Sequence, residues 1–410
     1  MAKSVITALD VGTTKISAVI AEISEELELK ILGVGVGPSA GLVKGVITNI
    51  PAAVEAISSA IERAEKTAGL TIESAYVGIA GPHISSLNSQ GIVAVADPQN
   101  PISEYDIARA VESARIVHVP NNREIIHVVP RFYTLDGQDQ VIDPVGMFAN
   151  RLDVDAHVIT ASSSSINNLI QCIEGSGIQV ESLVLDQLAS TEAVIEHEEL
   201  QHGVALCDIG GGTTDISVYI DGNICHTGVI EVGGSLMTRD LIAALKAPHH
   251  SAEKIKREYG HVIPSMVESS ELIELDSFGM ERKKAVERKY VAEILQQRCE
   301  ELFQMINAEI QRGISTQMLS AGLVLTGGAS KISGMERLGE TVLDMPVRIG
   351  LPKNLAGLSD ILHDPAYATS VGLLRWAIRE QSLNINKKPG EFSNNFIKKI
   401  ASIMKIWQPQ

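Results

Sequence analysis

Hydrophobic positions along the chain follow two different spacings, which predicts strands and helices in alternation. Residues 50–67 carry apolar side chains every three or four positions, with Pro51 in the first turn, as is typical of a helix. Short apolar runs on either side of it predict buried strands. The strands predicted in this region are 4–9, 15–22, 29–36 and 74–80. This stretch therefore has the pattern of an α/β unit.

The pattern changes between residues 83 and 161. Short β segments at 91–96, 125–133 and 155–161 flank one helix at 103–115. Ser103 stands at the N-cap position of this helix, and Asp106 three residues later completes a capping box. We expect an inserted α+β module of about eighty residues here.

Residues 162–200 return to the first pattern, and the second half of the chain repeats it. The further predicted elements are helices at 165–174, 188–195, 252–259, 284–312 and 368–379, and strands at 179–185 and 321–325. The expected division is a first lobe from 1–82 and 162–200, the inserted module 83–161, a second lobe from 201–245 and 313–380, a charged helical subdomain 246–312, a linker 381–391 and a final segment 392–410.

Composition indicates a soluble globular protein of more than one domain. The 410 residues exceed what a single core usually supports, and 45% of them are hydrophobic while 20% are charged. The net charge of −16 argues against general nucleic-acid binding. The four cysteines form no CxxC pair, which indicates free thiols rather than a metal site. Neither a signal peptide nor a long apolar helix is visible, so we expect a cytosolic protein unless another element holds it at a membrane.

One chemical motif occurs twice. Residues 9–17 read Leu-Asp-Val-Gly-Thr-Thr-Lys-Ile-Ser, and residues 207–217 read Cys-Asp-Ile-Gly-Gly-Gly-Thr-Thr-Asp-Ile-Ser. In each copy a Gly/Thr turn follows an apolar strand that ends in Asp. Glycine lets backbone N–H groups approach an anion, Thr hydroxyls add donors, and the Asp can hold a hydrated divalent cation. One copy could be an ordinary tight turn, but two copies predict paired lobes that hold a nucleotide's phosphates from both sides.

Two weaker signals accompany these hairpins. The sequence Thr326-Gly327-Gly328-Ala329 follows an apolar strand, and it could be a plain turn between strand and helix or a loop under a nucleoside. Glu253 and Lys256 lie three apart on a predicted helix, so both project to one side. They could form a solvated ion pair or reach a ribose and base.

The final segment combines an apolar helix face with positive charge. Residues 387–410 contain five Lys and one Glu, so this segment carries +4 while the rest of the chain carries −20. The expected membrane-binding residues are Phe396, Ile397, Lys398, Lys399, Ile400, Ile403, Met404 and Trp407. A cationic amphipathic helix on an acidic body predicts reversible binding to an anionic lipid membrane. A docked core helix, or a helix that binds a partner protein, is the alternative.

Together these features resemble the actin/Hsp70/sugar-kinase ATPase superfamily and, within it, the FtsA family of bacterial actin-like cell-division proteins. The likeness spans the whole chain in order, including the module and the tail. The matching stretches are 8–15, 76–81, 188–190, 208–215, 232–234 with Thr238 and Asp240, and 324–329. The resemblance implies an α/β, actin-like ATPase fold with two duplicated lobes, a small α+β module inserted in the first lobe, and a C-terminal amphipathic helix.

The resemblance also implies a set of site residues. The cofactors would be ATP and Mg²⁺, with Asp10 and Asp208 orienting the metal through water. The implied nucleotide-binding residues are Asp10, Gly12, Thr13, Thr14, Lys15, Asp208, Gly210, Gly211, Gly212, Thr213, Thr214, Gly233, Gly234, Glu253, Lys256, Gly327, Gly328 and Ala329. Asp186 stands where actin-like ATPases place a residue that orients the attacking water, although Gln187 could also serve and Asp186 could simply begin a helix. No other general base is evident, so we expect slow hydrolysis at most, with ATP acting mainly as a conformational ligand.

By the same resemblance, the chain would form filaments on the cytoplasmic face of the cell membrane at the division septum. It would tether FtsZ filaments there through the FtsZ C-terminal tail and recruit later divisome proteins. The inserted module would mediate contact between subunits, and residues 246–312 would receive the FtsZ tail. Arg298 is a candidate contact there, or simply a solvated helix arginine.

Two other functions share parts of this pattern. A small-molecule kinase of the same superfamily would need a carboxylate base beside a polar cleft, and it has no use for a cationic tail. A PilM-like scaffold of type IV pilus assembly shares the fold and the module, but the C-terminal amphipathic segment argues against it.

Overall fold

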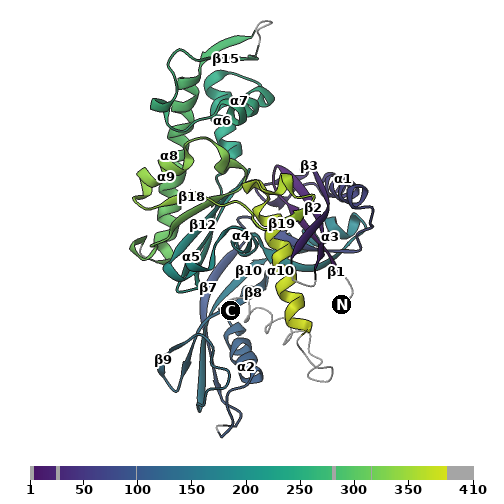
Figure 1. Ribbon diagram of the computed structural model, residues 1–410, viewed down its shortest axis with the longest axis vertical. Coiled ribbons are helices and arrows are strands. Elements are labelled where there is room, and N and C mark those ends of the chain that lie inside the picture. Colours follow the sequence, from purple (N-terminus) through teal and green to yellow (C-terminus); the bar gives the residue numbers. More distant parts are fainter. Residues whose placement is uncertain (1–3, 25–27, 98, 279–282, 315, 386–410) are drawn as a thin grey trace.

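The structure is a computed structural model that describes residues 4–24, 28–97, 99–278, 283–314 and 316–385. The predicted amphipathic segment and residues 386–391 of the predicted linker lie outside these ranges. Figure 1 shows a central body with one part projecting at each end of the long axis. No helix in the described ranges has both the length and the apolarity needed to cross a bilayer.

Two sheets with the same plan form the central body. The first has the order β11-β6-β1-β2-β3-β19, and its strands are β1 (Ser4–Val11), β2 (Lys15–Ile23), β3 (Leu29–Pro38), β6 (Ser74–Ile79), β11 (Gln179–Leu185) and β19 (Leu355–Gly357). The second has the order β14-β13-β12-β17-β18, and its strands are β12 (Val204–Ile209), β13 (Thr214–Ile220), β14 (Asn223–Ile230), β17 (Gly322–Thr326) and β18 (Val347–Ile349). In each sheet an antiparallel three-strand meander lies beside a parallel strand, which confirms the expected duplication.

Helices cover both faces of each sheet. The helices α1 (Ile50–Ala68) and α3 (Ser163–Gly175) bury their apolar sides on one face of the first sheet. On one face of the second sheet lie α6 (Gly234–Leu245), α8 (Arg288–Gly313) and α9 (Met335–Leu343). Between the sheets lie α4 (Asp186–Val194) and α10 (Ala368–Ile385), whose side chains share one apolar core with both sheets. The short helix α5 (His197–His202) and the two-residue strands β4 (Leu42–Val43) and β5 (Val46–Ile47) complete the body.

The module predicted at 83–161 forms a separate four-stranded sheet with the order β7-β10-β8-β9. Its strands are β7 (Ser85–Ala94), β8 (Arg123–Leu135), β9 (Gln138–Val141) and β10 (Arg151–Ser162). The helix α2 (Glu104–Arg115) packs on this sheet around a core of its own, and Ser103 and Asp106 form the predicted capping box. The module is the lower projection in Figure 1. Its strands are longer than expected because polar residues on their exposed face interrupt the apolar runs.

The sequence had suggested that the charged subdomain is helical, but the structure shows that it is not entirely so. It contains α7 (His249–Tyr259) and a small antiparallel pair of strands, β15 (Leu272–Leu275) and β16 (Lys284–Glu287). The single helix predicted over 284–312 is therefore wrong at its start. Residues of β16 pair with β15, so that Val286 lies opposite Ile273 and is buried, and α8 begins only at Arg288.

The assignment of all of 313–380 to the second lobe also needs correction. After β18 the chain returns to the first sheet, where β19 pairs in parallel with β3, and α10 then packs against α4 and β1. The helix α10 continues to Ile385, five residues into the range expected for the linker. Short 3₁₀ turns occupy Pro264–Met266, Thr316–Met318, Gly328–Lys331, Asp360–Leu362 and Pro365–Tyr367.

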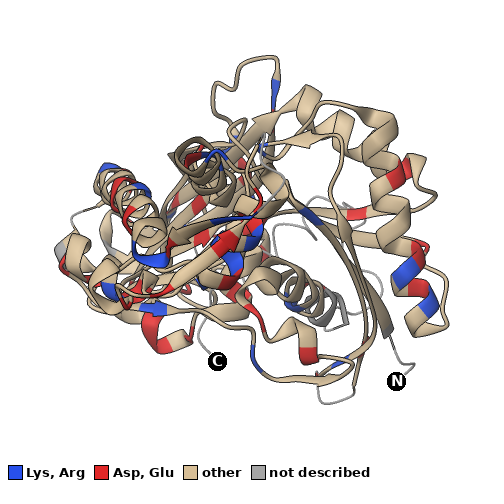
Figure 2. Cartoon of the chain, turned by 90° about the horizontal axis from the view of Figure 1, so that it is seen from above, with Lys and Arg blue, Asp and Glu red and all other residues tan. Residues whose placement is uncertain are grey.

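Acidic and basic residues occur close together along the same helices (Figure 2). The pairs Arg115–Glu112, three residues apart, and Lys254–Glu258, four residues apart, are examples. Such neighbouring opposite charges stabilise exposed helix faces only slightly, by about 0.2–0.5 kcal/mol per pair. Many of the charges thus form local pairs on helix surfaces.

Candidate functional site

The two glycine hairpins meet between the lobes. Each is a four-residue turn closed in the same way: the N–H of Gly12 donates to the carbonyl of Lys15, and the N–H of Gly210 donates to the carbonyl of Thr213, both at 3.0 Å. A Cβ on Gly211 would lie 2.3 Å from Cγ2 of Thr14. The turns therefore touch, and only glycine fits at this point of contact.

Two of the predicted carboxylates occupy equivalent positions in the hairpins. Asp10 pairs with Ser17 across β1 and β2, and Asp208 pairs with Asp215 across β12 and β13. Oδ2 of Asp10 accepts a hydrogen bond from Ser370 at 3.3 Å. The structure thus brings Asp10 and Asp208 into one buried centre with the turns, as the duplicated motif had indicated.

Two further carboxylates lie at the same centre. Asp186 begins α4, and its Oδ1 is buried without a hydrogen-bond partner. Gly78 leaves room for it, since a Cβ at that position would lie 2.4 Å from this oxygen. Asp215 accepts hydrogen bonds from Gln187 Nε2 at 3.2 Å and from the hydroxyl of Thr213 at 3.1 Å. Asp215 was not predicted, although an acidic residue in a strand that is otherwise apolar was a visible signal.

Burial and mutual repulsion raise the pKa of these acids. The pKa of Asp208 rises to about 6 and that of Asp215 to about 8, because burial disfavours the charged form. The pKa of Asp186 lies well above its ordinary range, because of burial and the neighbouring carboxylates. Burial also raises the pKa of Asp10, with Lys15 opposing that change. A divalent cation would relieve this repulsion.

Lys15 lies beside the acids. Its Nζ donates to the carbonyl of Ala366 and lies 3.6 Å from the centre of the Tyr367 ring, which is within range for a cation–π contact. Burial lowers the pKa of Lys15, while Asp10 and Asp208 oppose that shift. The ammonium group is therefore held near the first turn, where it can face an anion.

The donor set fits a hydrated cation better than one bound directly by side chains. Within the described ranges, no three His, Cys, Asp or Glu side chains are placed to bind one metal ion directly. The unpartnered Oδ1 of Asp186 and the glycine turns that a Cβ would fill suit a ligand that brings its own waters and phosphate oxygens. The expected action of Asp10 and Asp208 on Mg²⁺ through water stays a prediction.

The glycine pair Gly233-Gly234 supports the second hairpin. The N–H groups of Gly234 and Ser235 donate to the carbonyls of Gly210 and Gly211, at 2.9 and 2.8 Å. Gly233 packs on the same turn, since a Cβ there would lie 2.7 Å from the carbonyl oxygen of Gly210. These contacts fix the turn from behind.

The third glycine loop, at Gly327, lies against Asp208, the acid of the second hairpin. Gly327 has a φ of +83°, and a Cβ there would lie 2.3 Å from Oδ1 of Asp208. The positive φ and the close approach both require glycine. Gly328 and Ala329 belong to a short 3₁₀ turn, and α9 begins only at Met335.

Glu253 and Lys256 form an ion pair in which Lys256 is buried and Glu253 is partly exposed. Nζ of Lys256 donates to Oε2 of Glu253 at 2.7 Å, to the hydroxyl of Thr238 at 2.8 Å and to the carbonyl of Gly234 at 2.9 Å. Burial opposes the charged form of Glu253, but the bonds from Lys256 and Thr238 lower its pKa overall. The pair ties α7 to the start of α6 beside Gly234.

Arg298 lies away from this centre, on α8. Its guanidinium forms two hydrogen bonds with Asp240, at 2.6 and 3.1 Å, and a further ion pair with Glu301. It is therefore not a simple solvated helix arginine. A peptide carboxylate could bind Arg298 only by replacing or sharing these partners.

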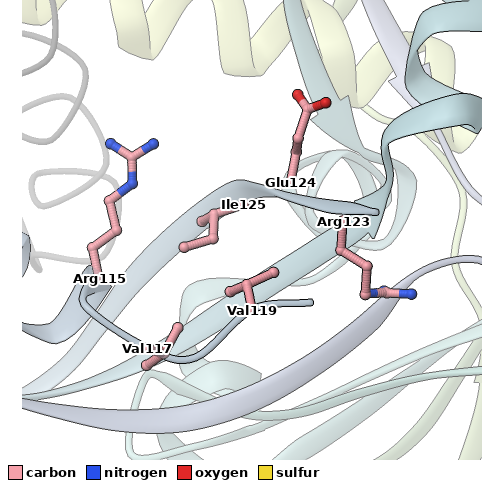
Figure 3. A pocket seen from close by; sticks show the side chains of 6 residues that line it. All are labelled: Arg115, Val117, Val119, Arg123, Glu124 and Ile125. Atoms are coloured by element: carbon pink, nitrogen blue, oxygen red, sulfur yellow. The ribbon is translucent and has the colours of Figure 1, made fainter. Parts of the chain in front are cut away.

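A separate hollow of about 340 Å³ lies at the inserted module (Figure 3). It is lined by Arg115, Val117, Val119, Arg123, Glu124 and Ile125. Arg123 also donates to the carbonyl of His83 at 2.9 Å, which ties β8 to the residues just before β7 within the module. None of the predicted nucleotide-binding residues lines this hollow.

Comparisons with known proteins agree with this architecture. A family model described as "Cell division protein FtsA" matches residues 205–372, and one described as "SHS2 domain inserted in FTSA" matches residues 81–160, which is the module. Cell division protein FtsA of Pseudomonas aeruginosa is 40% identical over 377 residues, covering 92% of this chain and 90% of that protein.

Two solved structures are similar in fold. A PilM–PilN type IV pilus biogenesis complex aligns with a TM-score of 0.66 at 15% identity, covering 91% of this chain and 98% of that one. MreB5 of Spiroplasma citri bound to ADP aligns with a TM-score of 0.57 at 13% identity, covering 94% of this chain and 99% of that one. At these identities the likeness concerns the fold, and it confirms the expected actin-like architecture. The family matches and the full-length identity go further: this chain belongs to the FtsA family of cell division proteins.

Proposed function

We propose that this actin-like cell division protein binds ATP and Mg²⁺ between its two hairpins and assembles into filaments in that state. The observation that carries the proposal is the contact of two equivalent glycine turns, each of which follows a strand that carries an acid near its end, Asp10 in one lobe and Asp208 in the other. The phosphates would bring the negative charge that the N–H groups of the turns can bind. The metal ion would bring the positive charge that the acids attract. An anion between the turns would meet backbone N–H groups from both lobes.

The chain's own residues divide the work of binding. Thr13 and Thr14 would donate hydroxyl hydrogen bonds to phosphate oxygens, and Lys15 would add a positive charge. Thr213 would do the same after its hydroxyl leaves Asp215, to which it donates in the structure. Asp10 and Asp208 would orient the water shell of the metal. Glu253 and Lys256 hold the start of α6 beside the second turn, so their proposed role is at the ribose side of the site.

Hydrolysis would be slow on this arrangement. The raised pKa of Asp186 favours its protonated form, which is a poor base. Gln187 is engaged by Asp215 and leaves its Oε1 unpartnered, so Asp186 and Gln187 both stay candidates for orienting water. We therefore propose ATP chiefly as a ligand that fixes the lobes together.

We further propose that the C-terminal segment binds the cytoplasmic face of the cell membrane at the division septum. The apolar face and the charge of +4 on residues 387–410 support this proposal. A single amphipathic segment of this kind binds reversibly, whereas a filament would present many copies at high effective concentration. Filaments on the membrane would tether FtsZ through its C-terminal tail, with residues 246–312 as the proposed receiving part, and would recruit later divisome proteins.

Liposome sedimentation tests the membrane proposal. Trp407→Glu should abolish pelleting with vesicles that contain anionic lipid, because it places a charge on the apolar face. Gln408→Glu adds the same charge one position away and should pellet nearly as the wild type does. Equal pelleting of wild type and Trp407→Glu would rule the membrane proposal out, and binding of a fluorescent ATP analogue should be the same for all three proteins.

The two rival functions make different predictions. A kinase would transfer phosphate to a small-molecule acceptor, which we do not expect. The PilM–PilN complex is similar to this chain in fold, at 15% identity. This likeness does not imply that the chain binds the same partner. Binding of an FtsZ tail peptide, and not of a pilus-protein peptide, would support the division role at the level of partners.

A further inference from the structure

The first turn of α10 contacts the acids of both lobes. Thr369 donates its hydroxyl hydrogen to Oδ2 of Asp208 at 3.3 Å, and the neighbouring Ser370 donates to Oδ2 of Asp10 at 3.3 Å. Thr369 and Ser370 are buried. Two consecutive residues of one helix thus connect the two carboxylates that the proposed function places at the metal.

Further hydroxyl groups support these contacts. Ser17 lies 2.8 Å from Ser370, and Ser190 of α4 lies 3.0 Å from both Thr369 and Oδ2 of Asp208. The helix α10 can reach this position because Gly372 packs directly on α4, where a Cβ would lie 1.8 Å from the carbonyl oxygen of Ala189. The contacts therefore belong to a rigid helix pair rather than to a loop.

The two oxygens of Asp208 have different surroundings. The hydrogen bonds from Ser370, Thr369 and Ser190 all reach Oδ2. Oδ1 of Asp208 instead faces Gly327, the glycine of the third loop. A hydroxyl that holds Oδ2 fixes the rotation of the carboxyl group and leaves Oδ1 to accept from the water shell of a metal ion.

From these contacts we infer that Thr369 and Ser370 are positioning residues that set the orientation and spacing of Asp208 and Asp10 for hydrated Mg²⁺. This inference rests on the proposed function, since it concerns the same metal. It assigns to α10, which carries none of the glycine motifs, the task of aligning one acid from each lobe.

The test measures how Mg²⁺ changes the binding of a fluorescent ATP analogue to the full chain. Thr369→Val keeps the shape of the side chain but removes the hydroxyl, and it should raise the Mg²⁺ concentration for half-maximal effect by about tenfold, the worth of one lost hydrogen bond to a charged group. Affinity in EDTA should be unchanged, and Thr369→Ser, which keeps the hydroxyl, should restore the wild-type response. The matched control is Thr341→Val on α9, whose hydroxyl donates within its own helix to the carbonyl of Arg337.

The outcomes separate this inference from the function beneath it. If Mg²⁺ does not change nucleotide binding by the wild type, both the positioning inference and the proposed function are overturned. A wild type that responds to Mg²⁺, beside a Thr369→Val variant that responds identically, would overturn only the positioning role. Equal loss of affinity with and without Mg²⁺ would show a structural role and also overturn it. If Thr369→Val does not fold, Ser370→Ala tests the same positioning role at Asp10. The same outcomes would support or overturn the inference.

Discussion

Thr14 of the first hairpin lies directly against Gly211 of the second, so the two lobes meet at their turns. A Cβ on Gly211 would lie 2.3 Å from Cγ2 and 2.8 Å from Oγ1 of Thr14. Any side chain at position 211 must therefore displace the Thr14 side chain or push the turns apart. The absence of a Cβ at Gly211 therefore allows the two lobes to approach this closely.

Gly211→Ala should weaken binding of ATP by about tenfold or more, because overpacking of this kind costs roughly 1–3 kcal/mol. Titration with a fluorescent ATP analogue measures the effect. Gly37→Ala is the matched control, since a Cβ there would meet only Nη1 of Arg63, at 3.8 Å. Equal affinities of the two variants would contradict the placement of the nucleotide between the turns.

Gly372→Ala should lower the free energy of unfolding by about 1–3 kcal/mol or more, since the added methyl would overlap the backbone of α4. Urea denaturation followed by circular dichroism measures this. At Gly175 a Cβ would meet only the side chain of Val54, with the nearest atom at 3.2 Å, so Gly175→Ala should cost distinctly less. A smaller loss at position 372 than at position 175 would contradict the close packing of α10 on α4.

Asp215 should make the ligand-free protein less stable as the pH rises. Its pKa is about 8 in the folded protein and near 3.8 in the unfolded chain, so between these values the folded state binds one more proton. The free energy of unfolding then falls by about 1.4 kcal/mol per pH unit from this group, until the pH passes its folded pKa. Denaturant titrations of wild type and Asp215→Asn at pH 6, 7 and 8, without nucleotide or metal, measure the slope. The free energy of unfolding of Asp215→Asn should fall less steeply with pH than that of the wild type. Parallel pH profiles of the two proteins would contradict the protonated state of Asp215.

Lys44 and Glu231 form an ion pair between the lobes, with Nζ and Oε2 2.9 Å apart. Their side chains are 44% and 56% exposed, so water and salt screen the interaction. A double-mutant cycle with Lys44→Ala and Glu231→Ala should give a coupling energy below about 1 kcal/mol that decreases with salt. A larger, salt-independent value would show that this pair, and not the glycine contact, holds the lobes together.

The sequence predicted the parts of the fold whose signals are local. Both glycine hairpins, the capping box at Ser103 and Asp106, and the helices α1 and α2 follow from neighbouring residues. The strand β16 was missed because its four residues have a charged composition and gain their conformation from pairing with β15. The return of β19 and α10 to the first lobe was missed because pairing across more than three hundred residues leaves no local pattern.

The site was predicted where glycine and acid stand together in one motif. Asp10 and Asp208 come together as expected. Asp215 was overlooked because Asp208, the equivalent of Asp10, already supplied the acid expected in the second hairpin. Thr369 and Ser370 could not be identified, since a Thr-Ser pair in a helix has no signature of its own. Only the three-dimensional path of α10 brings their hydroxyls to the acids of both hairpins.

The late return of α10 has a consequence for the growing polypeptide. Ile6, Ala8 and Val19 of the first sheet are buried in the same core as Val371, Leu374 and Ala377. While the ribosome is still making residues before 368, this apolar face has no cover from α10. The nascent chain must therefore carry an unfinished first lobe through most of its translation, and it is during that interval that we expect chaperones to bind it.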